Sequence, residues 1–251
     1  MGQKLLQDRV AIVTGGGSGI GREICTTFAR EGAILAVLDI NEDAANSVAV
    51  SVGGLAIEID VSESRSCADA VQVVAESLGP PTILICSAAY FAQRVPLADL
   101  ADDVWEKCLN VNIGGHFNMS KQCIPHMVAA GGGSIIHISS IMAKVANFGQ
   151  TAYCTTKGAL TMLSKGIALD YAKDGIRSNT LMPGGIATQG MADLYGGDMA
   201  RAEAEWGAIM HPMGRLGKVA EIASAALFLA SDAASFITGV DLPVEGGYSI
   251  R

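Results

Sequence analysis

The sequence contains few charged residues and no block of basic ones. Only 17% of its 251 residues are charged, and 25 acidic residues against 17 basic ones give a net charge of −8. Proteins that bind nucleic acid need clustered lysine and arginine to neutralise phosphates. We therefore expect a small-molecule substrate and no nucleic-acid partner.

Long apolar runs are also absent. No stretch reaches about 18 uninterrupted apolar residues, the length that a membrane-spanning helix needs, and the first residues lack the apolar core of a secretory signal. Six cysteines are scattered without a Cys-x-x-Cys pair: Cys25, Cys67, Cys86, Cys108, Cys123 and Cys154. This usage predicts free, buried thiols in a cytoplasmic protein. The lack of a membrane-spanning run predicts no membrane partner.

The histidines show no spacing typical of metal ligands. They are His116, His126, His137 and His211. We expect no metal site and interpret these side chains as structural.

Half of the residues are hydrophobic, and short β-branched runs alternate with helical patterns along the whole chain. The predicted strands are residues 10–14, 34–39, 56–60, 83–87, 134–139, 177–181 and 240–244. The predicted helices are residues 21–30, 43–51, 62–77, 101–130, 151–173 and 219–230. This alternation predicts an α/β fold, a Rossmann-type doubly wound parallel sheet of about seven strands with helices on both faces.

The length fits a single domain over residues 1–251. Residues 184–217 interrupt the alternation with a segment rich in glycine and methionine. Because this insertion follows the sixth strand, it lies at the carboxyl edge of the sheet, where such folds bind ligands. We interpret it as a mobile lid over the substrate.

The first strand ends in a glycine-rich turn that leads into a helix. The turn carries Gly15, Gly17, Ser18, Gly19, Ile20 and Gly21. Glycines allow the backbone to turn tightly and to approach a pyrophosphate, which the helix N-terminus stabilises. A merely flexible turn is the alternative, but the order strand, turn and helix favours a dinucleotide site.

The second strand ends at Asp39, 18 residues after Gly21. A carboxylate there can accept hydrogen bonds from the adenosine ribose and repel a 2′-phosphate. Ile40 supplies no cation for such a phosphate. NAD is therefore favoured over NADP, although Asp39 could instead serve only at the start of a helix.

Tyr153 and Lys157 lie four residues apart at the start of a long predicted helix and so share one face. A phenol is a weak base at neutral pH, and a nearby ammonium favours its phenolate. Ser140, just after a predicted strand, can hydrogen-bond a substrate oxygen. The Tyr-x-x-x-Lys spacing also occurs by chance on exposed helices, so its weight comes from agreement with the glycine turn.

Across nearly its whole length the chain resembles the short-chain dehydrogenases/reductases. The matching pieces are the turn at residues 14–21, Asp60-Val61, Asn110-Val111-Asn112, Ile138-Ser139-Ser140, Tyr153-x-x-x-Lys157, Asn179 with Pro183-Gly184, and Gly246-Gly247. The resemblance implies a dehydrogenase or reductase that is usually a homotetramer.

The resemblance also implies residue roles. Tyr153 would be the general acid/base, Lys157 would lower its pKa and bind the nicotinamide ribose, and Asn112 would hold a water in a proton relay. Ser140 would position the substrate, with Ser139 the second choice. Further cofactor contacts would come from Asp60, Val61, Ser87, Ala88, Pro183, Gly184, Ile186 and Thr188. Apart from the resemblance, we expect the substrate to meet Ser140, Asn147, Tyr153 and Gly185. The other residues expected to shape its site are Tyr90, Phe91, Met142 and residues 189–212.

One segment departs from the family pattern. Where the family usually has Asn-Asn-Ala-Gly after the fourth strand, this chain has Cys86-Ser87-Ala88-Ala89. We expect the change to tune the site and interpret Cys86 as a structural thiol.

The expected function is hydride transfer between NAD(H) and a secondary alcohol or ketone, such as a sugar, a polyol or a cyclic alcohol. An NADP-dependent ketoreductase and a non-catalytic nucleotide sensor are the alternatives. A sugar-nucleotide epimerase would need an additional substrate domain.

Overall fold

The computed structural model describes residues 4–250, so the ends of the predicted domain lie outside the described residues. Seven parallel strands form one sheet in the order β3-β2-β1-β4-β5-β6-β7. Their bounds are β1 Val10–Thr14, β2 Ile34–Asp39, β3 Leu55–Glu58, β4 Ile83–Cys86, β5 Gly133–Ile138, β6 Ile176–Pro183 and β7 Asp241–Val244. The predicted Rossmann-type architecture is confirmed.

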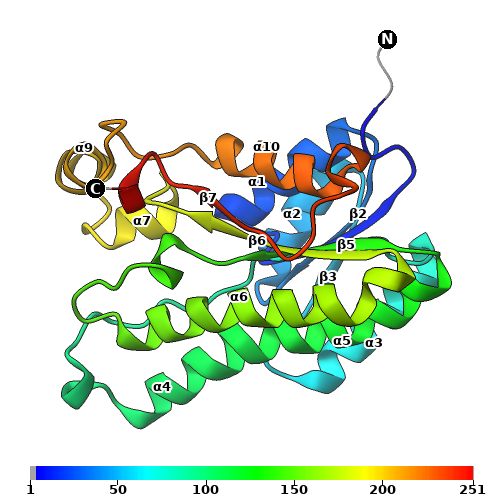
Figure 1. Cartoon of the computed structure of the whole chain (residues 1–251), viewed down its shortest axis with the longest axis horizontal. Helices are drawn as coiled ribbons and strands as arrows, with labels where there is room; N and C mark the ends of the chain where they lie inside the picture. The colour runs from blue at the N-terminus through cyan, green and yellow to red at the C-terminus, as the bar shows by residue number, and fades with distance from the viewer. Residues whose placement is uncertain (1–3, 251) are drawn as a thin grey trace.

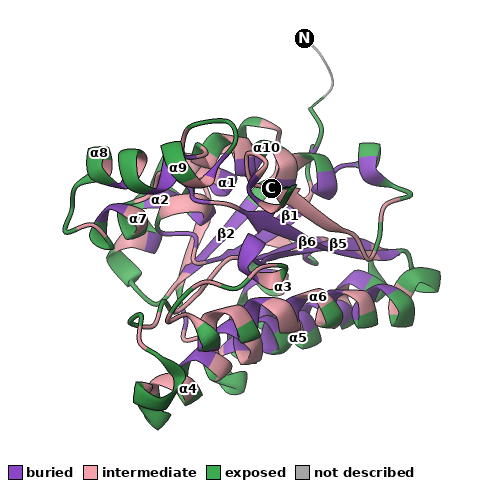
Figure 2. Ribbon diagram, turned by 60° about the vertical axis from the view of Figure 1, so that its left-hand side comes forward, coloured by how far each residue is buried: buried purple, intermediate pink, exposed green. Residues whose placement is uncertain are grey.

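Helices cover both faces of the sheet (Figure 1). One layer contains α1 (Gly19–Arg30), α2 (Glu42–Val52) and α10 (Val219–Ala230), and the other contains α3 (Ser64–Leu78), α5 (Gly115–Ala129) and α6 (Thr151–Tyr171). Burial on both faces explains why the central strands read as continuous apolar runs. Figure 2 shows the buried residues gathered in the sheet and on the helix sides facing it.

The predicted helix over residues 101–130 is interrupted. α4 (Asp102–Leu109) is followed by a π-helical turn at Asn110–Gly114, which leads directly into α5. A π-helical turn is wider than an α-helical one and is frequent at functional sites. The apolar periodicity of the sequence does not reveal this π-helical turn, because α-helix precedes and follows it and the whole stretch is predicted as one helix.

The insertion at residues 184–217 is more regular than expected. It contains the short helices α7 (Gln189–Asp193), α8 (Met199–Ala202) and α9 (Ala208–Met210), with a π-helical turn at Glu203–Gly207. Its residues Ala202, Trp206 and Leu216 form a small separate core with residues from outside the insertion, which are Ile141, Met142 and Tyr248. The insertion lies beyond the carboxyl ends of the strands (Figure 1), as predicted.

No helix among the described residues is long and apolar enough to cross a membrane. All six cysteines are free thiols, and five of them are buried.

Candidate active site

A cleft of about 420 Å³ opens at the carboxyl edge of the sheet. Parallel sheets of this kind bind ligands where the strand order reverses, here between β1 and β4. Most of the predicted site residues line it: Gly15, Ser18, Gly19, Ile20, Gly21, Asp39, Asp60, Val61, Ser87, Ala88, Ser140, Tyr153, Lys157, Pro183, Gly184, Gly185, Ile186 and Thr188. The structure therefore brings predicted residues between positions 15 and 188 together in one cavity.

Close backbone packing requires glycine at positions of this turn. Gly15 has a φ of +63°, and a Cβ on it would lie 2.8 Å from the backbone nitrogen of Ala88. A Cβ on Gly21 would overlap the carbonyl oxygen of Gly15. Side chains would therefore push the turn and the β4 loop apart. Ser18 is the N-cap of α1, and its side chain makes no capping hydrogen bond, which leaves the helix N-terminus able to receive an anion.

Asp39 holds the glycine turn and also faces the cleft. Its Oδ2 accepts a hydrogen bond of 2.9 Å from the backbone nitrogen of Gly17, and its Oδ1 accepts one of 3.0 Å from Asn41. Asn41 is the N-cap of α2 and accepts from Ala44. Because each carboxylate oxygen has more than one acceptor direction, the side chain can still accept bonds from a ligand. Gly17 thus acts behind the cleft lining.

The loop after β4 is tied to the end of β1. The hydroxyl oxygen of Thr14 accepts hydrogen bonds from the backbone nitrogens of Ser87 and Ala88, at 3.1 and 3.3 Å. These bonds use only the backbone of the loop. The departure from the family sequence at Cys86–Ala89 therefore leaves the attachment of this loop intact.

Tyr153 and Ser140 face the same part of the cleft. Burial raises the pKa of the Tyr153 phenol, while a hydrogen bond with the Ser140 side chain lowers it in part. The Ser140 hydroxyl also accepts from the backbone nitrogen of Met142, at 3.1 Å. Ser139, in contrast, donates its hydroxyl to the carbonyl oxygen of Lys157, at 2.8 Å. That bond gives Ser139 a structural role and leaves Ser140 as the serine paired with Tyr153.

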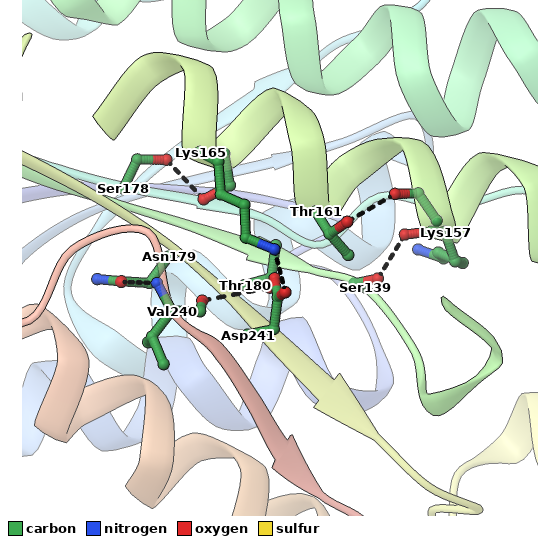
Figure 3. Close-up of polar contacts among 11 residues, drawn as sticks. Ser139, Lys157, Thr161, Lys165, Ser178, Asn179, Thr180, Val240 and Asp241 are labelled. Carbon is green, nitrogen blue, oxygen red and sulfur yellow. Dashed lines mark hydrogen bonds and ion pairs between the residues drawn. The ribbon is translucent and has the colours of Figure 1, made fainter. Parts of the chain in front are cut away.

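Lys157 is buried beneath the cleft. Its Nζ donates to the carbonyl oxygen of Ile138, at 2.8 Å, and lies 5.6 Å from the centre of the Tyr153 ring. Burial lowers its pKa from 10.5 to about 8, so it remains mostly charged at neutral pH. Figure 3 shows the bond from Ser139, which follows β5, and the ion pair between Lys165 and Asp241. These two contacts fix α6 to the end of β5 and to β7.

Asn112 lies behind the cleft lining, within the π-helical turn. It is fully buried, and its amide pairs with the backbone of Tyr90: Oδ1 accepts at 2.7 Å and Nδ2 donates at 3.0 Å. Nδ2 also donates to the Thr156 hydroxyl, at 3.3 Å. The side chain thus anchors the loop after β4 to α6.

The substrate end of the cleft differs in part from the prediction. Asn147 lies outside the lining, and its amide oxygen accepts from the backbone nitrogen of Phe148. Gln150 lines the cleft instead. The Phe91 ring stacks on Tyr153 with ring centres 5.3 Å apart. Arg94 and Trp206, for which no sequence motif indicates a role, also line this end.

Two histidines lie next to Cys86, although they are distant in sequence. Cys86, His116 and His137 are buried, and ligand-type atoms of all three lie within 4.8 Å of one another. The Nδ1 atoms of His116 and His137 are 3.0 Å apart, the distance of a hydrogen bond. Burial raises the pKa of the Cys86 thiol, which supports a structural role.

A glycine turn, an acidic strand end and a serine–tyrosine–lysine set around one cleft define a class, the nucleotide-dependent oxidoreductases that act on alcohols. A family model described as enoyl-(acyl carrier protein) reductase matches residues 15–249. The chain belongs to the short-chain dehydrogenase/reductase family, whose members use NAD or NADP.

Characterised relatives match over nearly the full length. The 2,5-dichloro-2,5-cyclohexadiene-1,4-diol dehydrogenase of Sphingobium indicum is 37% identical, with 98% of each chain covered. The NAD-dependent glycerol dehydrogenase of Listeria innocua is 32% identical, with 98% of this chain and 96% of that protein covered. The ligand-free aldohexose dehydrogenase of Thermoplasma acidophilum superimposes with a TM-score of 0.90 at 35% identity, over 100% of this chain and 97% of that one. The chain is thus an oxidoreductase acting on alcohols.

Proposed function

We propose that this protein transfers hydride between NAD(H) and a secondary alcohol or ketone, with Tyr153 as the general acid/base. The observation that carries the proposal is the position of Tyr153 and Ser140 in the cleft that the glycine turn and Asp39 also line. Cofactor and substrate can therefore meet beside the phenol. A nicotinamide bound there would accept or supply the hydride.

The residues of the chain manage the proton. Tyr153 takes the proton of the alcohol while Ser140 donates a hydrogen bond to the substrate oxygen. Burial alone raises the pKa of Tyr153, so phenolate formation needs positive charge nearby. The Lys157 ammonium supplies part of that charge, and the oxidised nicotinamide would supply more. Asn112 would act as a positioning residue for the loop and for a water of the relay.

The proposed cofactor is NAD. Asp39 has a carboxylate at the adenosine end, and the next residue, Ile40, is exposed and uncharged. A 2′-phosphate there would meet like charge without a cation to balance it. A related protein is named as an NAD-dependent glycerol dehydrogenase, which supports the same choice.

The proposed substrates are sugars, polyols or cyclic alcohols. The names of the relatives include a cyclic diol, glycerol and an aldohexose. At this end of the cleft, Ser140, Tyr153 and Gln150 supply polar groups, and Phe91 and Met142 supply apolar surface. Residues 184–217 would close over the bound substrate as a lid.

The test is oxidation of a panel of secondary alcohols, followed as formation of NADH or NADPH. We expect turnover with NAD on at least one sugar, polyol or cyclic alcohol. Binding of NADH without oxidation of any panel member would support a nucleotide sensor instead. Faster turnover with NADP would refute the choice of cofactor.

We also propose a cytoplasmic homotetramer. Large apolar side chains are exposed on the outer surfaces of two helices: Phe117 and Val128 on α5, and Met162 and Leu169 on α6. Burial of such a surface between copies would stabilise an assembly. Light scattering should give the mass of four chains, and a stable monomer would contradict this proposal.

A further inference from the structure

Arg94 is a cationic side chain at the substrate end of the cleft. It lies on the loop after β4, three residues beyond Phe91, whose ring stacks on Tyr153. The backbone nitrogen of Val95 donates to the carbonyl oxygen of Gly149, at 3.1 Å. That bond joins the Arg94 loop to the segment that begins α6 and fixes where the arginine emerges.

The Arg94 guanidinium stacks on an aromatic ring of the lid. Its Cζ lies 5.6 Å from the centre of the Trp206 ring. Stacking attracts a cation but leaves the edge of the guanidinium plane, with its five N–H donors, free for other partners. An arginine held in this way is oriented in advance for a bidentate acceptor.

Within residues 4–250 no carboxylate lies within ion-pair distance of Arg94, whereas the other arginines near the lid have acidic partners. Arg201 pairs with Glu205 and Arg215 pairs with Glu221, at 2.7 and 2.6 Å. This difference occurs in a chain with an excess of acidic residues. Arg94 is therefore a cation that the described part of the protein leaves without a counter-ion.

The charge of the cleft is divided between its two ends. The acidic residues among the described lining are Asp39 and Asp60, and both belong to the end where the glycine turn lies. At the substrate end the charged lining residues are Lys157 and Arg94. The Arg94 side chain is exposed and lines the cleft, so a ligand entering this end can reach its guanidinium.

We propose that Arg94 binds a carboxylate of the substrate, so that the alcohol oxidised here is a hydroxy acid, such as a sugar acid or a cyclic hydroxy acid. A carboxylate fits one guanidinium in charge and in its two-oxygen geometry. The proposal rests on the proposed function in one respect, because it places the reacting hydroxyl at Tyr153. Anion binding itself needs no hydride transfer, so it can be tested separately.

The experiment is calorimetric titration of the full chain, saturated with NADH, with two unreactive ligands of nearly equal shape. Cyclohexanecarboxylate carries the charge, and cyclohexanecarboxamide lacks it. Charge-assisted hydrogen bonds at a partly exposed site predict that the acid binds about tenfold tighter. In Arg94→Met this preference should fall to about one, and Arg94→Lys should retain part of it.

Arg201→Met is the matched control, because Arg201 also stacks on a lid aromatic, Tyr195, but already pairs with Glu205. It should keep the full preference for the acid. Equal binding of acid and amide by the wild-type protein would overturn the proposal. So would an Arg94→Met variant that weakens both ligands equally, since that result would make Arg94 only a support for the lid.

Kinetics separates this proposal from the proposed function. We expect 3-hydroxycyclohexanecarboxylate to be oxidised with a higher kcat/KM than its carboxamide, and the ratio to collapse in Arg94→Met. Oxidation of neutral alcohols with no advantage for the acid would refute the carboxylate site and leave the dehydrogenase intact. Preferential binding of the acid with no oxidation of any alcohol would refute the dehydrogenase alone.

Discussion

The imidazole rings of His116 and His137 form one in-line hydrogen bond inside the protein. Their Nδ1 atoms are 3.0 Å apart and their ring centres are 5.3 Å apart. The ring centres are farther apart than the Nδ1 atoms by about twice the distance from a ring centre to its own nitrogen. The two Nδ1 atoms therefore point directly at each other. One ring must donate and the other accept. The Nε2 atoms of both rings are buried without a hydrogen-bond partner among the described residues.

The two rings satisfy each other's hydrogen bond. Each single replacement should therefore lower the free energy of unfolding by more than half of the loss caused by the double replacement. His116→Leu or His137→Leu leaves the remaining Nδ1 unsatisfied, at a cost of about 1–3 kcal/mol. The double variant removes both polar groups, so its loss of unfolding free energy should be smaller than the sum of the single losses. Urea denaturation of the four proteins measures the coupling. Additive losses would show that the rings do not depend on each other.

The same pair should make the protein sensitive to acid. Burial lowers the pKa of His137 from 6.5 to about 3 and that of His116 well below 6.5. The unfolded chain therefore binds more protons than the folded one between these values. Stability should fall as the pH is lowered from 6.5 toward 3. Melting temperatures over this range should fall less steeply in the double leucine variant, and equal slopes would refute this source of acid sensitivity.

Lys157 should reduce the stability of the protein while serving its chemistry. Burial lowers its pKa from 10.5 to about 8, so the folded state disfavours the ammonium. Lys157→Met should remove activity and raise the melting temperature at pH 7 by a few degrees, because it removes a buried charge. As pH rises from 8 to 10.5 the wild-type protein loses this penalty, so the difference should shrink. A variant less stable than wild type at pH 7 would contradict the expectation.

Asp39 should set the choice between the two cofactors. Asp39→Asn removes the charge but keeps an oxygen that can accept from Gly17. We expect kcat/KM with NADP to rise relative to NAD by about tenfold or more, as like-charge repulsion is lost. Ser18→Ala is a control, since it alters the same turn without changing charge. An unchanged ratio in Asp39→Asn would limit Asp39 to holding the turn.

The sheet could be predicted because its signals are local in sequence. The runs at β1 and β2 have the predicted bounds, since an apolar run between turn residues defines a buried strand. The glycine turn could also be predicted, because its glycines stand between a strand and a helix in the sequence. The structure shows why they are glycines: the turn closely approaches Ala88 and its own backbone. The grouping of Ser140, Tyr153 and Lys157 in one cleft agrees with the family resemblance.

Other features depend on contacts that sequence separation hides. Cys86, His116 and His137 come from three elements and meet only after folding. The π-helical turn at Asn110–Gly114 lies within residues 101–130, which the sequence pattern predicts as one continuous helix. The role of Arg94 depends on which side chains lie near it, and a list of charged residues cannot show that it lacks an acidic partner.

The central claim is that Tyr153 moves the proton, and Tyr153→Phe tests it most directly. This change removes one hydroxyl and keeps the ring that stacks against Phe91. The measurement is kcat for the best alcohol of the panel together with the dissociation constant for NADH. We predict that kcat falls by at least about 10³-fold, in the range of lost acid–base catalysis, while NADH binds nearly as before. Retained turnover in this variant would contradict the account.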